Sequence, residues 1–502
     1  MLTSAFQLSA SRSPGKTAIA YGTDGWTFSD FHRLSGNIGQ NLLAGGAEPG
    51  DRIALHLLNG PEFALAVAGC LKAGFIVVPI NTRLKGREID YILRHSGSAF
   101  YIGEPRLYDE IAHSCPALDE LSAFWLTGPA GQVGLPFDDL LRTPTRTGSL
   151  PDVPAEETAA IMYTSGTTAH PKGVVHTHGT LFETARAVHD MQLDENQVLV
   201  ITSSMAHQVG FGMAFLSGLV NGATTVITRP FDFEGALNAF ERWRGTYTMT
   251  LPVILQCLLK LQDEAPRDLS SARLFFGGGD SVTPALQQAF ARSIAPIWEV
   301  YGATEIAPAS WNHVSEVRIG SMGKPGKGIQ FRLADAHGSE ARPGCVGEIY
   351  VRGPHLAAGY WQEPEATRAV FQNGWFRSGD LAACDADGFY WFAGRKKEII
   401  VRGGSNISPQ EVEAALCEHC AVEEAGVVGK KDPLWGEIVI AHVALRPGRR
   451  LEEQELLAFV RERLADYKVP ATIIFHSELP KGATGKIQRR ALRDKEVPIL
   501  AG

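Results

Sequence analysis

A run of small hydroxylic residues between residues 163 and 173 is the strongest chemical signal in the sequence. The run follows an apolar segment that ends at Tyr163, and Pro171, Lys172 and Gly173 come shortly after it. Its members are Thr164, Ser165, Gly166, Thr167 and Thr168. Backbone N–H groups and hydroxyls of such a loop can surround phosphates, with the lysine supplying positive charge. The Walker A pattern is absent. Composition alone favours a phosphate loop and an ordinary surface turn about equally.

Further polar and glycine-rich segments follow along the chain in a fixed order. They are Leu274-Phe-Phe-Gly-Gly-Gly-Asp280, Tyr301-Gly-Ala-Thr-Glu305, Trp375-Phe-Arg-Ser-Gly-Asp380, Gly394-Arg395 and Pro480-Lys-Gly-Ala-Thr-Gly-Lys486. Taken singly, each has an ordinary explanation: a tight turn for the glycines and a solvated charge for the glutamate or lysine. Their order along one chain is what gives them weight.

In this order the segments resemble the motifs of the adenylate-forming superfamily. That superfamily includes acyl-CoA synthetases, adenylation domains of peptide synthetases and luciferases, and the resemblance covers essentially the whole chain. Two places depart from the family pattern. The family usually has a glycine before a variable residue at the position where this chain has Ala169-His170. Alanine, unlike glycine, rarely adopts positive φ values. Asp280 replaces a residue that is usually small.

The resemblance implies an ATP site and assigns roles within it. Thr304 would contact the α-phosphate, Glu305 with Thr164 would hold Mg²⁺, and Asp380 and Arg395 would contact the ribose. Mg²⁺ prefers carboxylate and other oxygen ligands. Lys486 would stabilise charge on the α-phosphate, so the expected catalytic residues are Lys486, Glu305, Thr304 and His207. The full set expected to bind ATP or AMP is Thr164, Ser165, Gly166, Thr167, Thr168, Lys172, Gly278, Gly279, Asp280, Tyr301, Gly302, Ala303, Thr304, Asp380, Arg395 and Lys486.

Acyl-CoA synthetases also transfer the acyl group to CoA, and the resemblance implies residues for that step. Gly403 and Gly404 would line a pantetheine tunnel, and Lys397 falls at the hinge position of the family. Trp435 matches a position near the CoA nucleotide, although a partly buried structural tryptophan explains it equally well. Lys468 is the basic residue of the segment expected to meet the CoA phosphates.

The acid is expected to bind around His207, which would act as a gate at the wall of the active site. A buried structural histidine is the alternative. The expected lining is small or apolar and consists of His207, Val209, Gly210, Phe211, Gly277, Ala303, Ile306 and Ala307. Such a lining favours an apolar fatty or aryl acid. Synthetases for malonate carry an arginine where this chain has Cys257, which disfavours dicarboxylic acids.

Strand and helix patterns indicate the framework that positions these residues. From residue 17 to about 310, short β-rich runs alternate with amphipathic helical runs, which predicts layered α/β sheets. Residues 318–395 consist of short aromatic runs between turns and predict a small antiparallel or barrel-like subdomain. Residues 396–502 predict a small, mobile α+β domain that carries Lys486. The expected division is therefore 1–395 and 396–502.

Composition limits the classes of partner and compartment. The 502 residues carry a net charge of −8, which does not favour nucleic acid, and the seven scattered cysteines favour a reducing compartment. The N-terminus lacks the pattern of a signal peptide, and the apolar stretch 63–80 is interrupted by Lys72 and glycines, so no membrane span is expected. We expect a cytoplasmic monomer or homodimer.

The function expected from these features is an AMP-forming acyl-CoA ligase that uses ATP, Mg²⁺ and CoA on an apolar (fatty or aryl) carboxylic acid. One alternative is an adenylation enzyme that loads a separate carrier protein. A second is an inactive module that binds a nucleotide or an acyl group; the retention of Lys486, Glu305 and Asp380 argues against it.

Overall fold

The computed structural model divides into two compact units. The first unit comprises Met1–Phe331 and Val351–Phe376, and the second comprises Arg332–Tyr350 and Arg377–Gly502. The residues described are 1–128, 133–145, 148–164, 171–280, 282–313, 315–335, 337–342, 344–396, 398–402, 405–432, 436–464, 466–482 and 485–493. Among the described helices, none is long and apolar enough to cross a lipid bilayer.

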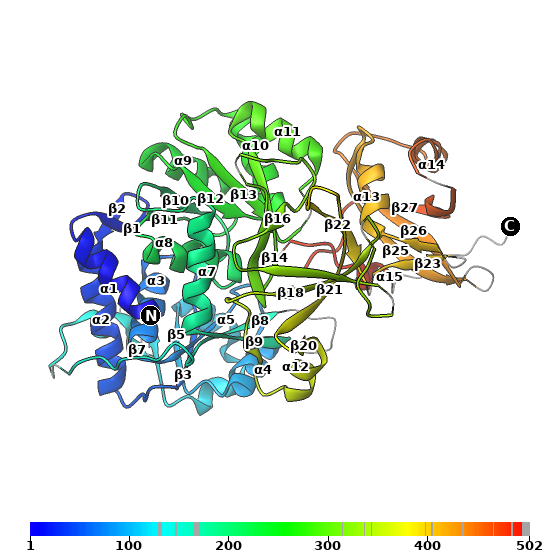
Figure 1. Ribbon diagram of the computed structural model, residues 1–502. Helices are drawn as coiled ribbons and strands as arrows, with labels where there is room; N and C mark the ends of the chain where they lie inside the picture. The colour runs from blue at the N-terminus through cyan, green and yellow to red at the C-terminus, as the bar shows by residue number, and fades with distance from the viewer. Residues whose placement is uncertain are drawn as a thin grey trace. The chain divides into compact units, whose positions relative to one another are not determined.

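Two large sheets form the framework of the first unit (Figure 1). The nine-stranded sheet has the order β16 (Lys324–Pro325), β15 (Ile306–Trp311), β14 (Ile297–Ala303), β13 (Leu274–Gly278), β12 (Tyr247–Thr250), β10 (Val198–Ile201), β11 (Thr224–Ile227), β1 (Thr17–Tyr21) and β2 (Asp24–Thr27). The eight-stranded sheet has the order β19 (Gly359–Tyr360), β9 (Lys172–Thr177), β8 (Thr158–Thr164), β4 (Ile76–Pro79), β3 (Arg52–His56), β5 (Phe100–Gly103), β6 (Ala123–Leu126) and β7 (Leu135–Pro136). Parallel pairs dominate the centre of both sheets, which confirms the predicted layered α/β fold.

The short β-rich runs between residues 17 and about 310 form strands in this unit, and burial on both faces explains their composition. Strands such as β4 and β12 are buried at every residue, so their sequences are nearly continuous apolar or threonine-rich runs. Several expected helices also form, among them α3 (Pro61–Lys72), α10 (Pro252–Glu264) and α11 (Pro284–Ser293). Each of these three begins with a proline in its first turn, where the missing N–H costs nothing.

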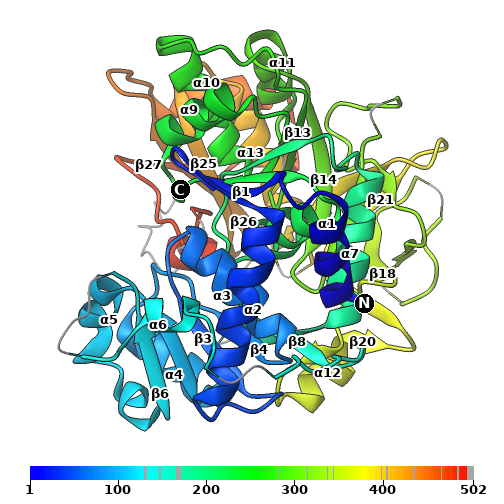
Figure 2. The same cartoon turned by 90° about the vertical axis from the view of Figure 1, so that its left-hand side faces the viewer.

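Helices α2 (Phe28–Ala44) and α3 lie side by side in both views (Figure 2). Their contact is close because Gly69 of α3 meets Ile38 of α2, where an added Cβ would lie 2.8 Å from the Ile38 Cβ. Every residue of α3 except Glu62 is buried, including its terminal Lys72.

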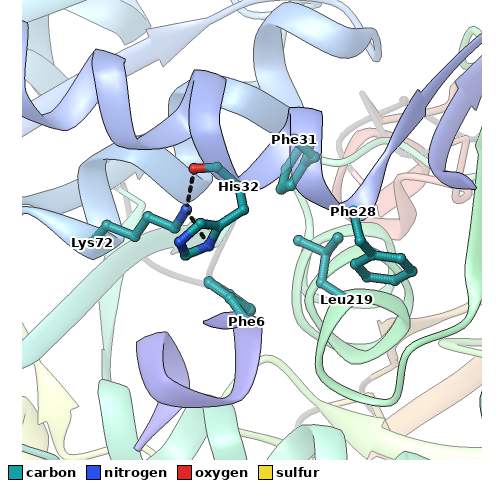
Figure 3. A pocket seen from close by; sticks show the side chains of 6 residues that line it. All are labelled: Phe6, Phe28, Phe31, His32, Lys72 and Leu219. Carbon is teal, nitrogen blue, oxygen red and sulfur yellow. Dashed lines mark hydrogen bonds between the residues drawn. The ribbon is translucent and has the colours of Figure 1, made fainter. Parts of the chain in front are cut away.

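The buried Lys72 amino group is satisfied by residues of α2 (Figure 3). It donates to the His32 carbonyl at 2.8 Å and to the Ser35 hydroxyl at 2.8 Å, and it lies 3.0 Å from His32 Nδ1. Burial lowers the pKa of Lys72 to about 7, and burial together with Lys72 lowers the pKa of His32 to about 4. The cavity beside them measures about 10 Å³, room for a water molecule at most. Lys72 therefore joins two helices and does not mark a ligand pocket.

The second unit contains a five-stranded sheet with α13 (Pro409–Cys417) and α14 (Glu453–Arg461). The strand order is β24 (Ser405–Ile407), β23 (Ile400–Arg402), β26 (Gly436–Leu445) and β25 (Val422–Asp432), and β27 (Thr472–His476) pairs in parallel with β26. Apolar residues of both helices pack with the strands in one core, including Val412, Leu416, Leu456 and Val460. A small α+β domain at the C-terminus is thereby confirmed.

Residues 318–395, expected as a small antiparallel or barrel-like subdomain, contribute a second five-stranded sheet. It runs in the order β17 (Gln330–Ala334), β18 (Gly347–Arg352), β21 (Trp375–Cys384) and β20 (Phe371–Gln372), and β22 (Tyr390–Arg395) pairs with β21. The division between the two units passes through β17, β18 and β21. The domain boundary expected at 395/396 stays a prediction, and the expected hinge residue Lys397 lies outside the described residues.

Candidate active site

The expected phosphate loop joins the two strands of a hairpin. Strands β8 and β9 are antiparallel, and Thr164 pairs with Lys172 at the end of the ladder. Ser165, Gly166, Thr167 and Thr168, together with Ala169-His170, lie outside the described residues. The structure therefore fixes the two ends of the loop and places Thr164 opposite Lys172.

Lys172 and Glu305 are linked through a residue that the sequence motifs do not contain, Tyr360 of β19. The Lys172 Nζ lies 4.7 Å from the centre of the Tyr360 ring, and the Tyr360 hydroxyl donates to Glu305 Oε1 at 2.7 Å. Burial, followed by the nearby Glu305, raises the pKa of Tyr360 well above its usual range. The phenol therefore keeps its proton and acts as a donor to the carboxylate.

The turn that carries Thr304 and Glu305 is held by backbone contacts on both of these residues. It connects β14 to β15, which pair in antiparallel fashion. The Thr304 carbonyl lies 2.8 Å from His176 Nε2, and the Glu305 carbonyl accepts from the Ala357 N–H at 2.8 Å. Burial lowers the pKa of His176 to about 4, so its ring is neutral and donates through Nε2. The position of the expected Mg²⁺ ligand is thus set by β9 and by residue 357.

The glycine segment at the end of β13 lies against β14, as close backbone packing requires. A Cβ on Gly278 would lie 2.3 Å from the Val300 carbonyl oxygen, and Gly279 has a φ of +79°. Both positions therefore require glycine. Gly277 pairs with Glu299 across the parallel ladder.

Glu299 is buried beside this segment and accepts a hydrogen bond from the Val282 backbone. Its Oε2 atom is buried without a hydrogen-bond partner in the described part of the chain. Burial raises the pKa of Glu299 to about 8, and Asp280 adds to the shift. A neutral carboxylic acid therefore supports the loop that contains Gly278, Gly279 and Asp280.

His207 lies between β10 and the π-helix η2 (Val209–Leu216). Its Nε2 is 3.1 Å from Asn81 Nδ2, so it contacts a residue that follows β4 of the other sheet. Phe211 and Gly210 are buried on η2, and Ile306 and Ala307 are buried on β15. The roles of these residues as an acyl lining stay predictions.

Gln208, next to His207, is 4% exposed, and both amide atoms of its side chain are buried without a hydrogen-bond partner among the described residues. A Cβ on Gly212 would lie 2.8 Å from the Gln208 Oε1, so glycine there makes room for the amide. An unpaired buried amide costs about 1–3 kcal/mol. It is therefore a candidate contact for a polar group on a bound acid.

In the second unit, Asp380 and Arg395 face each other across β21 and β22. They are a register pair, and the Arg395 Nε donates to Asp380 Oδ1 at 3.1 Å. Asp380 is buried, whereas the Arg395 side chain is 53% exposed. A half-exposed guanidinium beside a buried carboxylate suits the predicted contact with ribose, which needs both an acceptor and a donor.

Lys486 lies in a short hairpin between Lys481 and Ile487, which form a bridge. The Lys486 carbonyl accepts from the Gly482 N–H at 2.7 Å, and the Lys486 side chain is half-buried. In the same hairpin, Lys481 pairs with Glu424 at 2.9 Å. The hairpin thus contains both Lys481 and Lys486.

Among the residues expected to contact CoA, Lys468 is described and the others are not. Its ammonium group pairs with Glu411 at 2.5 Å. Gly403, Gly404 and Trp435 lie outside the described residues, so their predicted roles stay predictions.

Sequence patterns missed Tyr360, His176, Glu299 and Gln208 for a common reason. Each is an ordinary residue type in an ordinary strand or turn, and its significance depends on what packs against it. His176 carried one usable signal: it lies in β9, the strand that follows the phosphate loop.

Comparison with known proteins places these features in a family. Residues 6–361 match the AMP-binding enzyme family, and residues 411–486 match the AMP-binding enzyme C-terminal domain. The chain is 35% identical over 491 residues to feruloyl-CoA synthase of Amycolatopsis sp, covering 96% of each chain. It is 32% identical over 488 residues to indoleacetate–CoA ligase of Aromatoleum aromaticum, covering 96% of this chain and 95% of that one. The anthranilate CoA ligase AuaEII in complex with anthranoyl-AMP superposes with a TM-score of 0.92 at 31% identity, covering 98% of this chain and 96% of that one.

Tyr360→Phe should lower kcat/KM for pyrophosphate release by about tenfold, because a hydrogen bond to a charged group contributes roughly 1.5–3 kcal/mol. The ring over Lys172 is retained, so the effect reports the hydroxyl on Glu305 alone. Tyr163→Phe is the matched control, since its hydroxyl lies 2.8 Å from His95 Nδ1 instead. Equal rates for Tyr360→Phe and the wild type would show that the hydroxyl does not orient Glu305.

Glu299→Gln should remove a pH dependence of stability. The Glu299 pKa is raised from 4.5 to about 8 on folding, so the folded protein holds a proton that the unfolded chain loses. Stability should therefore fall between about pH 4.5 and 8, by about 1.4 kcal/mol per pH unit. The amide variant should have a higher Tm than the wild type at pH 8 and a similar Tm at pH 5. The exposed Glu264→Gln should behave as the wild type, and parallel Tm profiles for Glu299→Gln and the wild type would refute the assignment.

Proposed function

The chain belongs to the family of AMP-binding enzymes and is an AMP-forming acyl-CoA ligase, and on that premise we propose that it activates an aromatic carboxylic acid bearing a polar substituent. The observation that carries this proposal is the unpaired buried amide of Gln208 beside His207. The three similar proteins named above support it, since feruloyl, indoleacetyl and anthraniloyl groups are all aromatic and polar.

The first half-reaction makes the acid reactive. A carboxylate oxygen attacks the α-phosphorus of ATP, the bond to the β-phosphate oxygen breaks, and pyrophosphate leaves. Negative charge grows on the phosphoryl oxygens, and fixed cations and donors aimed there lower the barrier by a few kcal/mol each. We assign this stabilisation to Lys486 and Thr304, and we assign the β- and γ-phosphates to Lys172 and the loop that begins at Thr164.

Mg²⁺ is part of the proposal because the donor set suits a hard cation. Glu305 supplies a carboxylate and Thr164 a hydroxyl, which are the oxygen ligands that Mg²⁺ prefers. Tyr360 donates to Glu305 Oε1 and thereby fixes the direction of the carboxylate. A bound Mg²⁺ would neutralise phosphate charge.

The second half-reaction forms the thioester. The CoA sulfur attacks the carbonyl carbon of the acyl-adenylate, the mixed anhydride bond breaks, and AMP leaves with the bonding electrons. Lys486 is assigned to the first half-reaction only. For this step we assign Gly403 and Gly404 to the path of pantetheine.

A screen of acids by pyrophosphate release should rank substituted aryl acids above fatty acids of similar size. Feruloyl-type, indolylacetic and aminobenzoic acids should exceed the corresponding unsubstituted acids by about tenfold or more in kcat/KM, because each satisfies an unpaired amide. Gln208→Met should reduce that ratio, and the buried Gln287→Met is the control. A preference for long aliphatic acids would reject the aromatic proposal and leave the ligase chemistry intact.

Lys486→Ala should abolish adenylate formation and spare thioester formation from supplied acyl-adenylate. The expected loss in the first step is at least about a hundredfold, as for removal of a transition-state cation or donor. Lys481→Ala is the matched control in the same hairpin, because Lys481 is paired with Glu424.

Three results would decide between this function and its alternatives. Equal loss of both half-reactions would show that Lys486 is not confined to the first. Transfer to a pantetheinylated carrier protein without transfer to free CoA would favour the carrier-loading alternative. Pyrophosphate release that depends on an acid would exclude the alternative of an inactive binding module.

A further inference from the structure

Two asparagines at the ends of neighbouring strands hold the segment that leads to His207. Asn59 follows β3, and its amide donates to the Ser203 carbonyl at 2.8 Å and accepts from the Met205 N–H at 2.8 Å. Asn81 follows β4 and contacts His207 itself. The eight-stranded sheet thus sets the position of a segment that belongs to the nine-stranded sheet.

The direction of the Asn81 amide is fixed by its own turn. Its Oδ1 accepts a hydrogen bond from the Arg83 N–H at 3.0 Å, and its backbone carbonyl accepts from the Leu84 N–H at 3.0 Å. Because Oδ1 is taken by an N–H donor, the NH₂ group is the end that faces His207. The amide cannot be reversed without placing NH₂ against the Arg83 N–H.

This direction determines the protonation of the imidazole. The Asn81 Nδ2 is a donor, and His207 Nε2 lies 3.1 Å from it. A hydrogen bond between them requires a lone pair on Nε2, so the ring proton must be on Nδ1 and the ring is neutral. The opposite tautomer would oppose two N–H groups at that distance.

We propose that Asn81 is a positioning residue for the ligase reaction, which fixes the tautomer and the ring orientation of His207. The inference rests on the proposed function in one respect, namely that His207 lies at the wall of the acyl site. Asn81 acts through His207 and does not itself contact the reacting atoms. In this tautomer the His207 ring carries its proton on Nδ1. Rotation of the ring away from this position requires the hydrogen bond between Nε2 and Asn81 to break.

The first test reads the tautomer directly in the wild-type protein. With ¹⁵N-labelled histidine, the His207 signal is assigned by its loss in His207→Ala, and its two ring nitrogens are compared. The expected signature is a protonated Nδ1 and an unprotonated Nε2 at neutral pH. A proton on Nε2 would overturn the inference, whatever acid the enzyme uses.

The second test is a double-mutant cycle on acyl-CoA formation with the best acid of the screen. Asn81→Asp keeps the acceptor for Arg83 but puts a carboxylate oxygen against Nε2, so it should draw a proton to Nε2 and lower kcat/KM by about tenfold. Asn81→Ala should also lower kcat/KM. In the His207→Ala background, neither substitution should have more than about a twofold effect.

The cycle also separates this inference from the proposed function. If Asn81→Asp lowers kcat/KM equally in the wild-type and His207→Ala backgrounds, Asn81 has a structural role that does not act through His207, and the inference is overturned. Absence of acyl-CoA formation by the wild type with every acid would contradict the proposed function and leave the tautomer measurement standing.

Discussion

The turn between β14 and β15 is the constraint on which the candidate ATP site of the first unit depends. It carries Thr304 and Glu305, and its two carbonyls are tied to His176 and to the Ala357 N–H. Tyr360 then joins the Glu305 carboxylate to the Lys172 side of the phosphate loop. Because β9, β15 and β19 converge on this turn, a carboxylate that could have been mobile is held in one direction. Preorganised charge of this kind costs little reorganisation when substrate binds.

Several buried polar groups around the site are kept neutral, and this has a physical reason. Burial penalises a charged imidazole or carboxylate, so His176 remains a neutral donor and Glu299 a neutral acid over much of the physiological range. Each supports a segment that carries an expected nucleotide contact, Thr304 in one case and the Gly278–Gly279 loop in the other. The charges that remain, on Lys172, Glu305 and Arg395, belong to residues that are only half-buried or exposed.

Sequence patterns predict the α/β framework well and locate the motifs, because both depend on local features; the roles of the motif residues stay predictions. Buried parallel strands give apolar runs, and the motifs are contiguous in the chain. The links between motifs were not predictable in the same way. Tyr360 reaches Glu305 across 55 positions, and Asn81 reaches His207 across 126, so no spacing rule connects them. The expected lining suggested an apolar fatty or aryl acid. The amide of Gln208, which has no hydrogen-bond partner among the described residues, could be recognised only once its burial was known.

The central claim is that the acid is activated as an adenylate on the α-phosphorus of ATP, and an isotope measurement tests it most directly. The acid is supplied with ¹⁸O in its carboxylate, and the products of a complete reaction with ATP and CoA are analysed by mass. The account predicts that one ¹⁸O atom appears in the phosphate of AMP, because the carboxylate oxygen that attacks phosphorus stays there when the thioester forms. Appearance of ¹⁸O in orthophosphate, with ADP as the nucleotide product, would contradict it.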